Sequence, residues 1–336
     1  MPPILEVQNL VKKYGSIEVV KGISFTVEEG EVFGLLGPNG AGKTQTISML
    51  TGVIPPTSGT ARIGGHDIGR EMEKVKRING LVPQDLALYP TLSARANLNF
   101  FGRIYGLRGR ELKERVEDVL RIVALTERAD QAVEKYSGGM KRRVNIAAGL
   151  IHHPRLFFLD EPTVGVDPQS RNHIFESVQR LNRERGMTLV YTSHYMEEVE
   201  LLCSRVAIID QGRIIAIDTI KNMIARLGGG VIHIGVQNPD EALLAQLAAL
   251  PAIQEVALLP RPAAPPADGN QAEKALERQP AVAGSVVKIV AKDSQQAVIH
   301  AIQLLNDRHI PLTSLEILEP NLESVFLHLT GKKLRE

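Results

Sequence analysis

An apolar run, VFGLL at residues 32–36, leads directly into a glycine-rich segment, GPNGAGKT at residues 37–44. This segment matches the phosphate-binding loop pattern G-x-x-x-x-G-K-[ST] in full. Its glycines permit the tight turns that aim backbone N–H groups inward, and the helix expected at 43–51 adds its N-terminal dipole. A buried parallel strand, a loop and a helix in this order predict an α/β fold with a site for nucleotide phosphates.

Two side chains at the end of the loop carry charge or a metal-binding oxygen. Lys43 can reach the β- and γ-phosphates of a nucleotide as a cation, and the Thr44 hydroxyl can ligate Mg²⁺. We therefore expect ATP and Mg²⁺ to bind here. The loop residues expected to hold the nucleotide are Gly37, Pro38, Asn39, Gly40, Ala41, Gly42, Lys43 and Thr44.

A second apolar run, LFFLD at residues 156–160, ends in two adjacent carboxylates, Asp160 and Glu161. The carboxyl ends of parallel strands form the edge at which α/β folds bind ligands. We expect Asp160 to hold Mg²⁺ through water and Glu161 to act as general base on the attacking water. An acidic pair after a strand is weak evidence alone, but together with the phosphate loop it predicts nucleotide hydrolysis.

The rest of the first two thirds alternates between strand and helix patterns. Leu112, Val116, Val119 and Val123 share one helix face within a helical stretch from about residue 91 to 124. Strands alternating with helices predict a mainly parallel sheet covered on both faces. The further strands expected are 4–9, 22–27, 188–192, 205–210 and an edge strand at 213–217.

A second domain follows three glycines at 228–230, so we expect domains at 1–228 and 231–330. The patterns in it run β-α-β-β-α-β, the order of the ferredoxin-like unit. The expected strands are 231–236, 253–259, 285–291 and 312–318, and the expected helices are 240–250 and 294–306. Residues 260–284, rich in proline and alanine, are expected to be mostly disordered.

Composition limits the classes of function. The chain has 39 Lys and Arg against 38 Asp and Glu, a balance that argues against a dedicated nucleic-acid binder. No run approaches the ~20 apolar residues of a membrane helix, and the N-terminus lacks a signal-peptide pattern. The single cysteine, Cys203, is expected to be buried and fits a reducing compartment. We expect a cytoplasmic protein whose membrane role is peripheral.

The segment YSGGMKRRVNIAAGL at residues 136–150 resembles the signature sequence of ABC ATP-binding cassettes, usually LSGGQ. Ser137, Gly138 and Gly139 precede an amphipathic helix and so form a second anion-binding N-terminus. A single chain already has one phosphate loop. The resemblance implies a head-to-tail dimer, a homodimer or paired cassettes, in which each signature covers the ATP of the opposite subunit.

Four more residues stand in the order of the family's motifs, and the resemblance covers about residues 4–218. It implies that Tyr14 stacks on adenine and that Gln84 senses the γ-phosphate and Mg²⁺. It implies that Asp167 lies on the loop that crosses to the other subunit and that His194 is the switch histidine. Taken alone, Tyr14 would be ordinary packing and His194 a satisfied core histidine.

Two positions depart from the family pattern. Gln45 stands where a second Ser or Thr usually contacts the α-phosphate; its backbone N–H remains and its amide can donate instead. Met140 replaces the glutamine of the signature. Neither change removes a charge that hydrolysis requires.

Two other groups of polar residues do not indicate a site. The pair His152-His153 is interpreted as a solvated helix end rather than a metal pair, and the run Lys141-Arg142-Arg143 as a solvated helix face.

The resemblance implies a fold and an activity. The fold is an ABC-type nucleotide-binding domain with antiparallel β and helical subdomains, followed by a small α+β domain. The activity is ATP hydrolysis that drives a separate membrane permease at the cytoplasmic face of the cell membrane. The tail at 319–333, EPNLESVFLHLTGKK, resembles that of ABC-2 type exporters of drugs, antibiotics, lipids or polysaccharide.

The alternative function is that of a non-transport ABC ATPase that acts on nucleic acid or ribosomes. It is disfavoured because the chain has one signature and no heptad run between Lys43 and Asp160.

Overall fold

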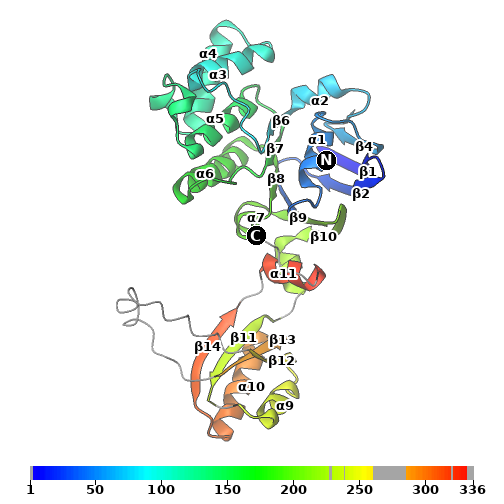
Figure 1. Cartoon of the computed structure of the whole chain (residues 1–336), viewed down its shortest axis with the longest axis vertical. Coiled ribbons are helices and arrows are strands. Elements are labelled where there is room, and N and C mark those ends of the chain that lie inside the picture. The colour runs from blue at the N-terminus through cyan, green and yellow to red at the C-terminus, as the bar shows by residue number, and fades with distance from the viewer. Residues whose placement is uncertain (1–2, 227–228, 238, 260–284, 319–320, 331–336) are drawn as a thin grey trace. The chain divides into compact units, whose positions relative to one another are not determined.

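The computed structural model describes residues 3–226, 229–237, 239–259, 285–318 and 321–330 (Figure 1). The chain forms two units, Met1–Ile220 with Phe326–Glu336, and Lys221–Val325. The sequence predicts a domain boundary at 228–231, whereas the two units divide at Ile220, directly after β10 (Arg213–Thr219). Strand β10 is the last strand of the first unit along the chain. The return of the chain to the first unit at Phe326 has no local sequence signal. The expected disordered segment, 260–284, lies outside the described residues.

The first unit is built on a six-stranded sheet. Its strands in spatial order are β10, β9 (Arg205–Asp210), β3 (Val32–Leu36), β8 (Thr188–Ser193), β7 (Leu156–Asp160) and β6 (Asn79–Val82). All neighbours pair in parallel except β10, which pairs antiparallel with β9. Every residue of β3, β7 and β8 is buried, as expected for central strands with both faces covered. The predicted parallel sheet is confirmed, with β6 as an additional strand.

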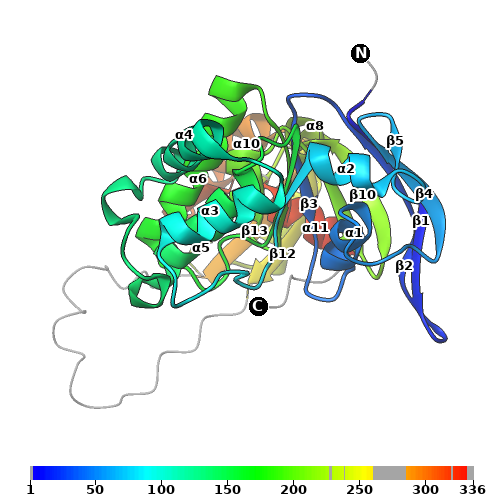
Figure 2. The same ribbon diagram turned by 90° about the horizontal axis from the view of Figure 1, so that it is seen from above.

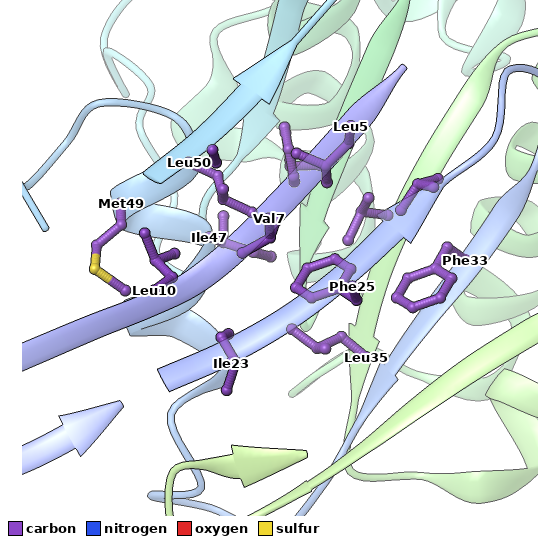
Figure 3. Packing of buried hydrophobic residues seen from close by; sticks show 14 of the residues in the cluster. Leu5, Val7, Leu10, Ile23, Phe25, Phe33, Leu35, Ile47, Met49 and Leu50 are labelled. Atoms are coloured by element: carbon purple, nitrogen blue, oxygen red, sulfur yellow. The ribbon is translucent and has the colours of Figure 1, made fainter. Parts of the chain in front are cut away.

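An antiparallel sheet stands beside it in the order β2 (Ile17–Val27), β1 (Leu5–Tyr14), β4 (Ser58–Ile63) and β5 (His66–Asp67). Figure 3 shows Leu5, Val7 and Phe25 of this sheet packed toward Leu35 of β3 and Ile47 of α1 (Lys43–Leu50). All five are at most 5% exposed. This core fixes α1 between the two sheets, and therefore fixes the loop that opens it.

Helices cover the other side of the parallel sheet. They are α3 (Ala94–Ile104), α4 (Gly109–Ile122), α5 (Gly138–Leu150) and α6 (Pro168–Arg185), and Figures 1 and 2 place them opposite the antiparallel sheet. The helical pattern expected at 91–124 is two helices, because Gly106 turns the chain with φ 86°. Leu112, Val116 and Val119 are buried on α4, as expected. Shorter elements are α2 (Met72–Ile78), η1 (Thr126–Arg128), η2 (Val133–Lys135) and α7 (Met196–Leu202).

The second unit contains an antiparallel sheet in the order β12-β13-β11-β14. Its elements are α8 (Ile220–Arg226), which begins at the last residue of the first unit, β11 (Val231–Val236), α9 (Glu241–Ala248), β12 (Ile253–Leu259), β13 (Ser285–Ala291), α10 (Ser294–Asp307) and β14 (Leu312–Leu318). Strand order and helix placement along the chain are those of the ferredoxin-like unit, as the sequence predicted. Helix α11 (Leu322–Thr330) spans the return to the first unit. No helix among the described residues has the length and apolarity needed to cross a membrane.

Candidate active site

The phosphate loop joins β3 to α1, and its backbone requires glycine. Gly40 and Gly42 have φ of 79° and 105°, which is the left-handed region that glycine adopts at no cost. A Cβ on Gly37 would lie 2.2 Å from the carbonyl oxygen of Ile209 on β9. Lys43, the first residue of α1, folds back over the loop, and its Nζ donates to the carbonyls of Gly37 (2.7 Å) and Pro38 (3.1 Å).

The same ammonium group forms an ion pair with the carboxylate after β7. Lys43 Nζ lies 2.9 Å from Glu161 Oε1, and both side chains are almost fully buried. Glu161 has φ 44°, a left-handed backbone conformation that non-glycine residues rarely adopt. Such strain is common where a fold holds a functional side chain in place. Two residues 118 positions apart in the sequence thus meet, as the two motifs together predicted.

Asp160, the last residue of β7, is surrounded by hydroxyl groups. Its Oδ1 accepts from Thr44 Oγ1 at 3.3 Å and from Thr192 Oγ1 at 2.8 Å. Burial raises the pKa of Asp160, and the two hydroxyl donors oppose that shift. Thr192 also accepts the backbone N–H of Glu161 at 2.9 Å. Sequence reasoning missed Thr192, whose place beside Asp160 follows from the β7–β8 register.

His194 follows β8 and faces the same carboxylate. Its Nδ1 lies 3.2 Å from Glu161 Oε2, although the approach does not have hydrogen-bond geometry. The neighbouring Tyr195 ring lies 4.1 Å from the imidazole, centroid to centroid. Lys43, Glu161 and His194 therefore converge at one point between the phosphate loop and the ends of β7 and β8.

These groups line a pocket of about 530 Å³ on the first unit. Its lining residues are Val19, Asn39, Gly40, Ala41, Gly42, Lys43, Thr44, Gln45, Gln84, Glu161, Val164, His194 and Tyr195. Tyr14 adjoins these lining residues, since its hydroxyl donates to Gln45 Oε1 at 2.8 Å, and the residue is 49% exposed. Gln84 is held by its backbone, because Arg142 Nη2 donates to its carbonyl at 2.6 Å.

Arg142 corrects the interpretation of Lys141-Arg142-Arg143 as a solvated face. Arg142 is 6% exposed and donates to the carbonyls of Pro83 and Gln84, and its burial lowers its pKa. It therefore ties α5 to the segment of Gln84. His152 is likewise no solvated helix end. Its ring stacks on Tyr105 at 3.7 Å, and burial lowers its pKa.

The signature residues form a separate group. Ser137 caps α5 by accepting from Met140 N at 3.2 Å, and Asp167 caps α6 by accepting from Ser170 N at 2.9 Å. The two helix ends are in contact: a Cβ on Gly139 would lie 2.0 Å from Ser170 Oγ. The bond from Ser170 N is the main cause of the lowered pKa of Asp167. None of Ser137, Gly138, Gly139 and Asp167 is among the residues that line the pocket.

A phosphate loop, the Glu161 carboxylate and a histidine line one pocket, and Asp160 is bonded to Thr44 of that loop. This arrangement defines the class as a nucleotide-hydrolysing cassette. Comparison with known proteins identifies the family. The pattern of the ABC transporter family matches residues 20–164. The linearmycin resistance ATP-binding protein LnrL of Bacillus subtilis is 48% identical over 334 residues, which is 99% of this chain and 100% of that protein. The chain belongs to the ABC transporter family.

Two more relatives match over nearly their full length. The daunorubicin resistance ATP-binding protein DrrA2 of Streptomyces coeruleorubidus is 36% identical over 96% of this chain and 93% of its own. The Nod factor export ATP-binding protein I of Ralstonia nicotianae is 37% identical over 99% and 96%. The names of all three relatives describe resistance or export. They give no support to an ATPase acting on nucleic acid or ribosomes.

Solved structures agree on the fold. The cbiO1 subunit of the Clostridium perfringens ABC transporter complex cbiONQ has a TM-score of 0.62 and 29% identity, covering 67% of this chain and 92% of that one. A dimeric ATP-binding cassette bound to ADP and Pi has a TM-score of 0.59 and 26% identity, covering 64% and 98%. The chain is the ATP-binding and ATP-hydrolysing subunit of an ABC transporter, and cassettes of this kind work as dimers with membrane permeases.

Proposed function

We propose that this subunit powers an ABC-2 type exporter, working at the cytoplasmic face of the cell membrane with a permease on another chain. The relatives named for linearmycin and daunorubicin resistance and for Nod factor export support an exported substrate of the drug or antibiotic class. The convergence of Lys43, Glu161 and His194 at the pocket carries the proposal that these three residues perform the hydrolysis. The experiment that tests this is the Glu161 substitution described in the Discussion.

In the proposed site, the phosphate loop holds the triphosphate and Tyr14 stacks on the adenine ring. Half of the Tyr14 side chain is exposed, and its hydroxyl is bonded to Gln45 at the rim of the pocket. Lys43, paired with Glu161 in this structure, meets the β- and γ-phosphates when ATP binds. The carboxylate of Glu161 then takes the proton of the attacking water, and His194 and Gln84 contact the γ-phosphate end.

The oxygen ligands at the end of β7 suit Mg²⁺, which prefers carboxylate and hydroxyl oxygens. Burial raises the pKa of Asp160, because its neighbours do not fully offset the cost of burying the charged carboxylate. A nearby cation would stabilise that charged form. We assign Asp160, Thr44 and Gln84 to the metal. When bound, Mg²⁺ supplies charge neutralisation of the phosphates.

Removing Mg²⁺ with EDTA is expected to abolish ATP hydrolysis. Asp160→Asn should weaken the effect of Mg²⁺ on nucleotide binding, because an amide does not attract the cation as a carboxylate does. Fluorescent ATP titrated with and without Mg²⁺ measures this separately from turnover. A chain that hydrolyses at full rate in EDTA, or an Asp160→Asn chain with an unchanged Mg²⁺ midpoint, would remove the metal assignment.

The two ATP sites are shared in the proposed assembly. The pocket of their own chain is not lined by Ser137, Gly138, Gly139 or Asp167, which supports their facing the nucleotide of the partner cassette. Ser137 and Gly138 are exposed at the N-terminus of α5, an end that favours anions. The partner is a second copy or a paired cassette arranged head to tail.

Contact with the permease is proposed for the segment after Gln84. Leu86, Tyr89, Leu92 and Phe100 are between 39% and 47% exposed there, and the Tyr89 and Phe100 rings meet edge to face at 4.9 Å. Buried Asn97 fixes the backbone of this segment. Its side chain accepts from the N–H of Tyr89 at 2.8 Å and donates to the carbonyl of Tyr89 at 3.0 Å. An apolar surface tied to Gln84 can pass the state of the nucleotide to a partner.

We expect crosslinks from the permease to fall within residues 85–110. Single cysteines at Leu86 or Phe100, in a Cys203→Ser background, give the test, and a cysteine at Lys74 on the exposed face of α2 is the control. Proximity-dependent crosslinking in membranes followed by mass spectrometry identifies the sites. Crosslinks that map only to residues 231–330 would contradict this surface.

A further inference from the structure

Glu198 on α7 is a buried carboxylate for which the proposed hydrolysis has no use. It is 3% exposed, and three hydroxyl groups converge on it. Thr163 Oγ1 lies 2.8 and 2.9 Å from its two oxygens, and Tyr191 and Ser193 donate to Oε2 at 2.9 and 3.0 Å. All four distances lie within the ordinary range of hydroxyl hydrogen bonds. Burying a carboxylate is costly unless it is bonded in this way, so the cluster is a specific arrangement.

The hydroxyl groups come from the two segments that carry the reactive side chains. Thr163 lies two residues after Glu161, and Ser193 lies immediately before His194. Ser193 Oγ also accepts from the backbone N–H of Tyr195 at 2.9 Å, which fixes the turn that presents the histidine. One carboxylate therefore fastens the segment of Glu161 to the segment of His194.

A third segment faces the same carboxylate. Arg171 lies on α6, one turn after Asp167, and its Nε lies 3.8 Å from Glu198 Oε1. That nitrogen is buried and makes no hydrogen bond within the described part of the chain. The Arg171 guanidinium also lies over the Tyr195 ring, 5.5 Å from its centroid. Glu198 thus connects the helix that Asp167 opens to both reactive segments.

We propose that Glu198 is a positioning residue for hydrolysis, holding Glu161 and His194 in register with each other and with the segment of Asp167. This inference rests on the proposed roles of Glu161 and His194. A carboxylate has two acceptor oxygens and no donor, so all three hydroxyls donate toward it. A neutral amide has only one acceptor oxygen and places an NH₂ donor where the second oxygen was. Some of the hydroxyls then lose their acceptor, and the segments of Glu161 and His194 are no longer bonded to one side chain.

The test is steady-state ATP hydrolysis by purified full-length Glu198→Gln. Because small displacements of reacting groups are costly, kcat should fall by at least about tenfold, with KM for ATP within about twofold of wild type. The matched control is Glu197→Gln, since Glu197 is the adjacent glutamate on α7 and is exposed. A wild-type kcat for Glu198→Gln, or a raised KM with an unchanged kcat, would overturn the proposal.

A second variant guards against misfolding. Thr163→Val keeps the shape of the side chain and removes one hydroxyl donor, and it should lower kcat less than Glu198→Gln with the same unchanged KM. A Thr163→Val chain with wild-type kcat would also count against the proposal. Melting temperatures of all variants identify any chain that does not fold.

The double variant Glu161→Gln/Glu198→Gln separates positioning from general damage. Since Glu198 acts in part through Glu161, the loss of rate in the double variant should be smaller than the product of the two single losses. Fully multiplicative losses would show that Glu198 acts independently, which contradicts the proposal. If Glu161→Gln keeps the wild-type rate, the proposed role of Glu161 as the base fails; if Glu161→Gln is slow and Glu198→Gln is normal, only this inference fails.

Discussion

Glu161→Gln is expected to bind Mg-ATP as wild type does and to hydrolyse it about 10²–10⁴ times more slowly. The amide keeps the shape of the side chain next to Lys43 and His194, but it cannot accept the proton of the attacking water. Binding persists because Lys43, Thr44 and the N–H groups of the loop are unchanged. Phosphate release measures the rate, and a fluorescent ATP analogue measures binding.

The same substitution should trap the dimer. With hydrolysis stalled, two ATP molecules stay between the phosphate loop of one chain and Ser137–Gly139 of the other. Glu161→Gln should therefore run as a dimer with Mg-ATP and as a monomer without it in size-exclusion chromatography with light scattering. Ser137→Arg in the same background is the control, because a bulky cation at the exposed N-cap blocks the signature. An ATP-loaded Glu161→Gln chain that stays monomeric would contradict the shared site for the isolated subunit, and one that hydrolyses at wild-type rate would remove Glu161 as the base.

Lys43→Ala is expected to lose ATP affinity and hydrolysis together, with kcat/KM lower by at least about 10²-fold. Lys43 lines the pocket, and its Nζ is bonded to the loop carbonyls and lies 2.9 Å from Glu161. Alanine removes both its attraction to the phosphates and its support of the loop. Isothermal titration with ATP and steady-state kinetics give the two quantities.

The control for this substitution is Lys74→Ala, which removes a lysine whose side chain is 63% exposed on α2. It should leave affinity and rate unchanged, since an exposed ion pair of this kind contributes little to stability and Lys74 does not line the pocket. A Lys43→Ala chain that binds and hydrolyses ATP as wild type does would show that the phosphate-loop assignment is wrong.

Much of the fold could be predicted because its strong local patterns agree with its global arrangement. The apolar runs of β3 and β7 are long enough to identify as buried strands. The first leads into the phosphate loop and the second ends in the carboxylates Asp160 and Glu161, and the two groups together indicate one nucleotide site. Strand β6 could not be found in this way. It has only four residues, begins Asn79-Gly80, and is a strand because Asn79–Val82 pairs with Leu156–Leu159 of β7.

The supporting residues of the site were equally invisible in the sequence. Thr192 stands beside Asp160 only because of the β7–β8 register. Glu197 and Glu198 are adjacent and chemically alike, yet the first is exposed and the second buried. Arg142 belongs to a run of three cations whose sequence gives no sign that one of them is buried. Motifs identify groups that meet a ligand, whereas the groups that hold them are chosen by tertiary contacts.

The most direct test of the shared site mixes two inactive chains. Lys43→Ala and Ser137→Arg should each be inactive as homodimers. In a head-to-tail heterodimer, one site carries both defects and the other combines the intact loop of one chain with the intact signature of its partner. At equal concentrations about a quarter of all sites are then intact by statistical mixing of a two-fold dimer. The measurement is ATP hydrolysis of the mixture: activity clearly above the sum of the separate chains is the predicted result, and activity equal to that sum would show that each site lies within a single chain.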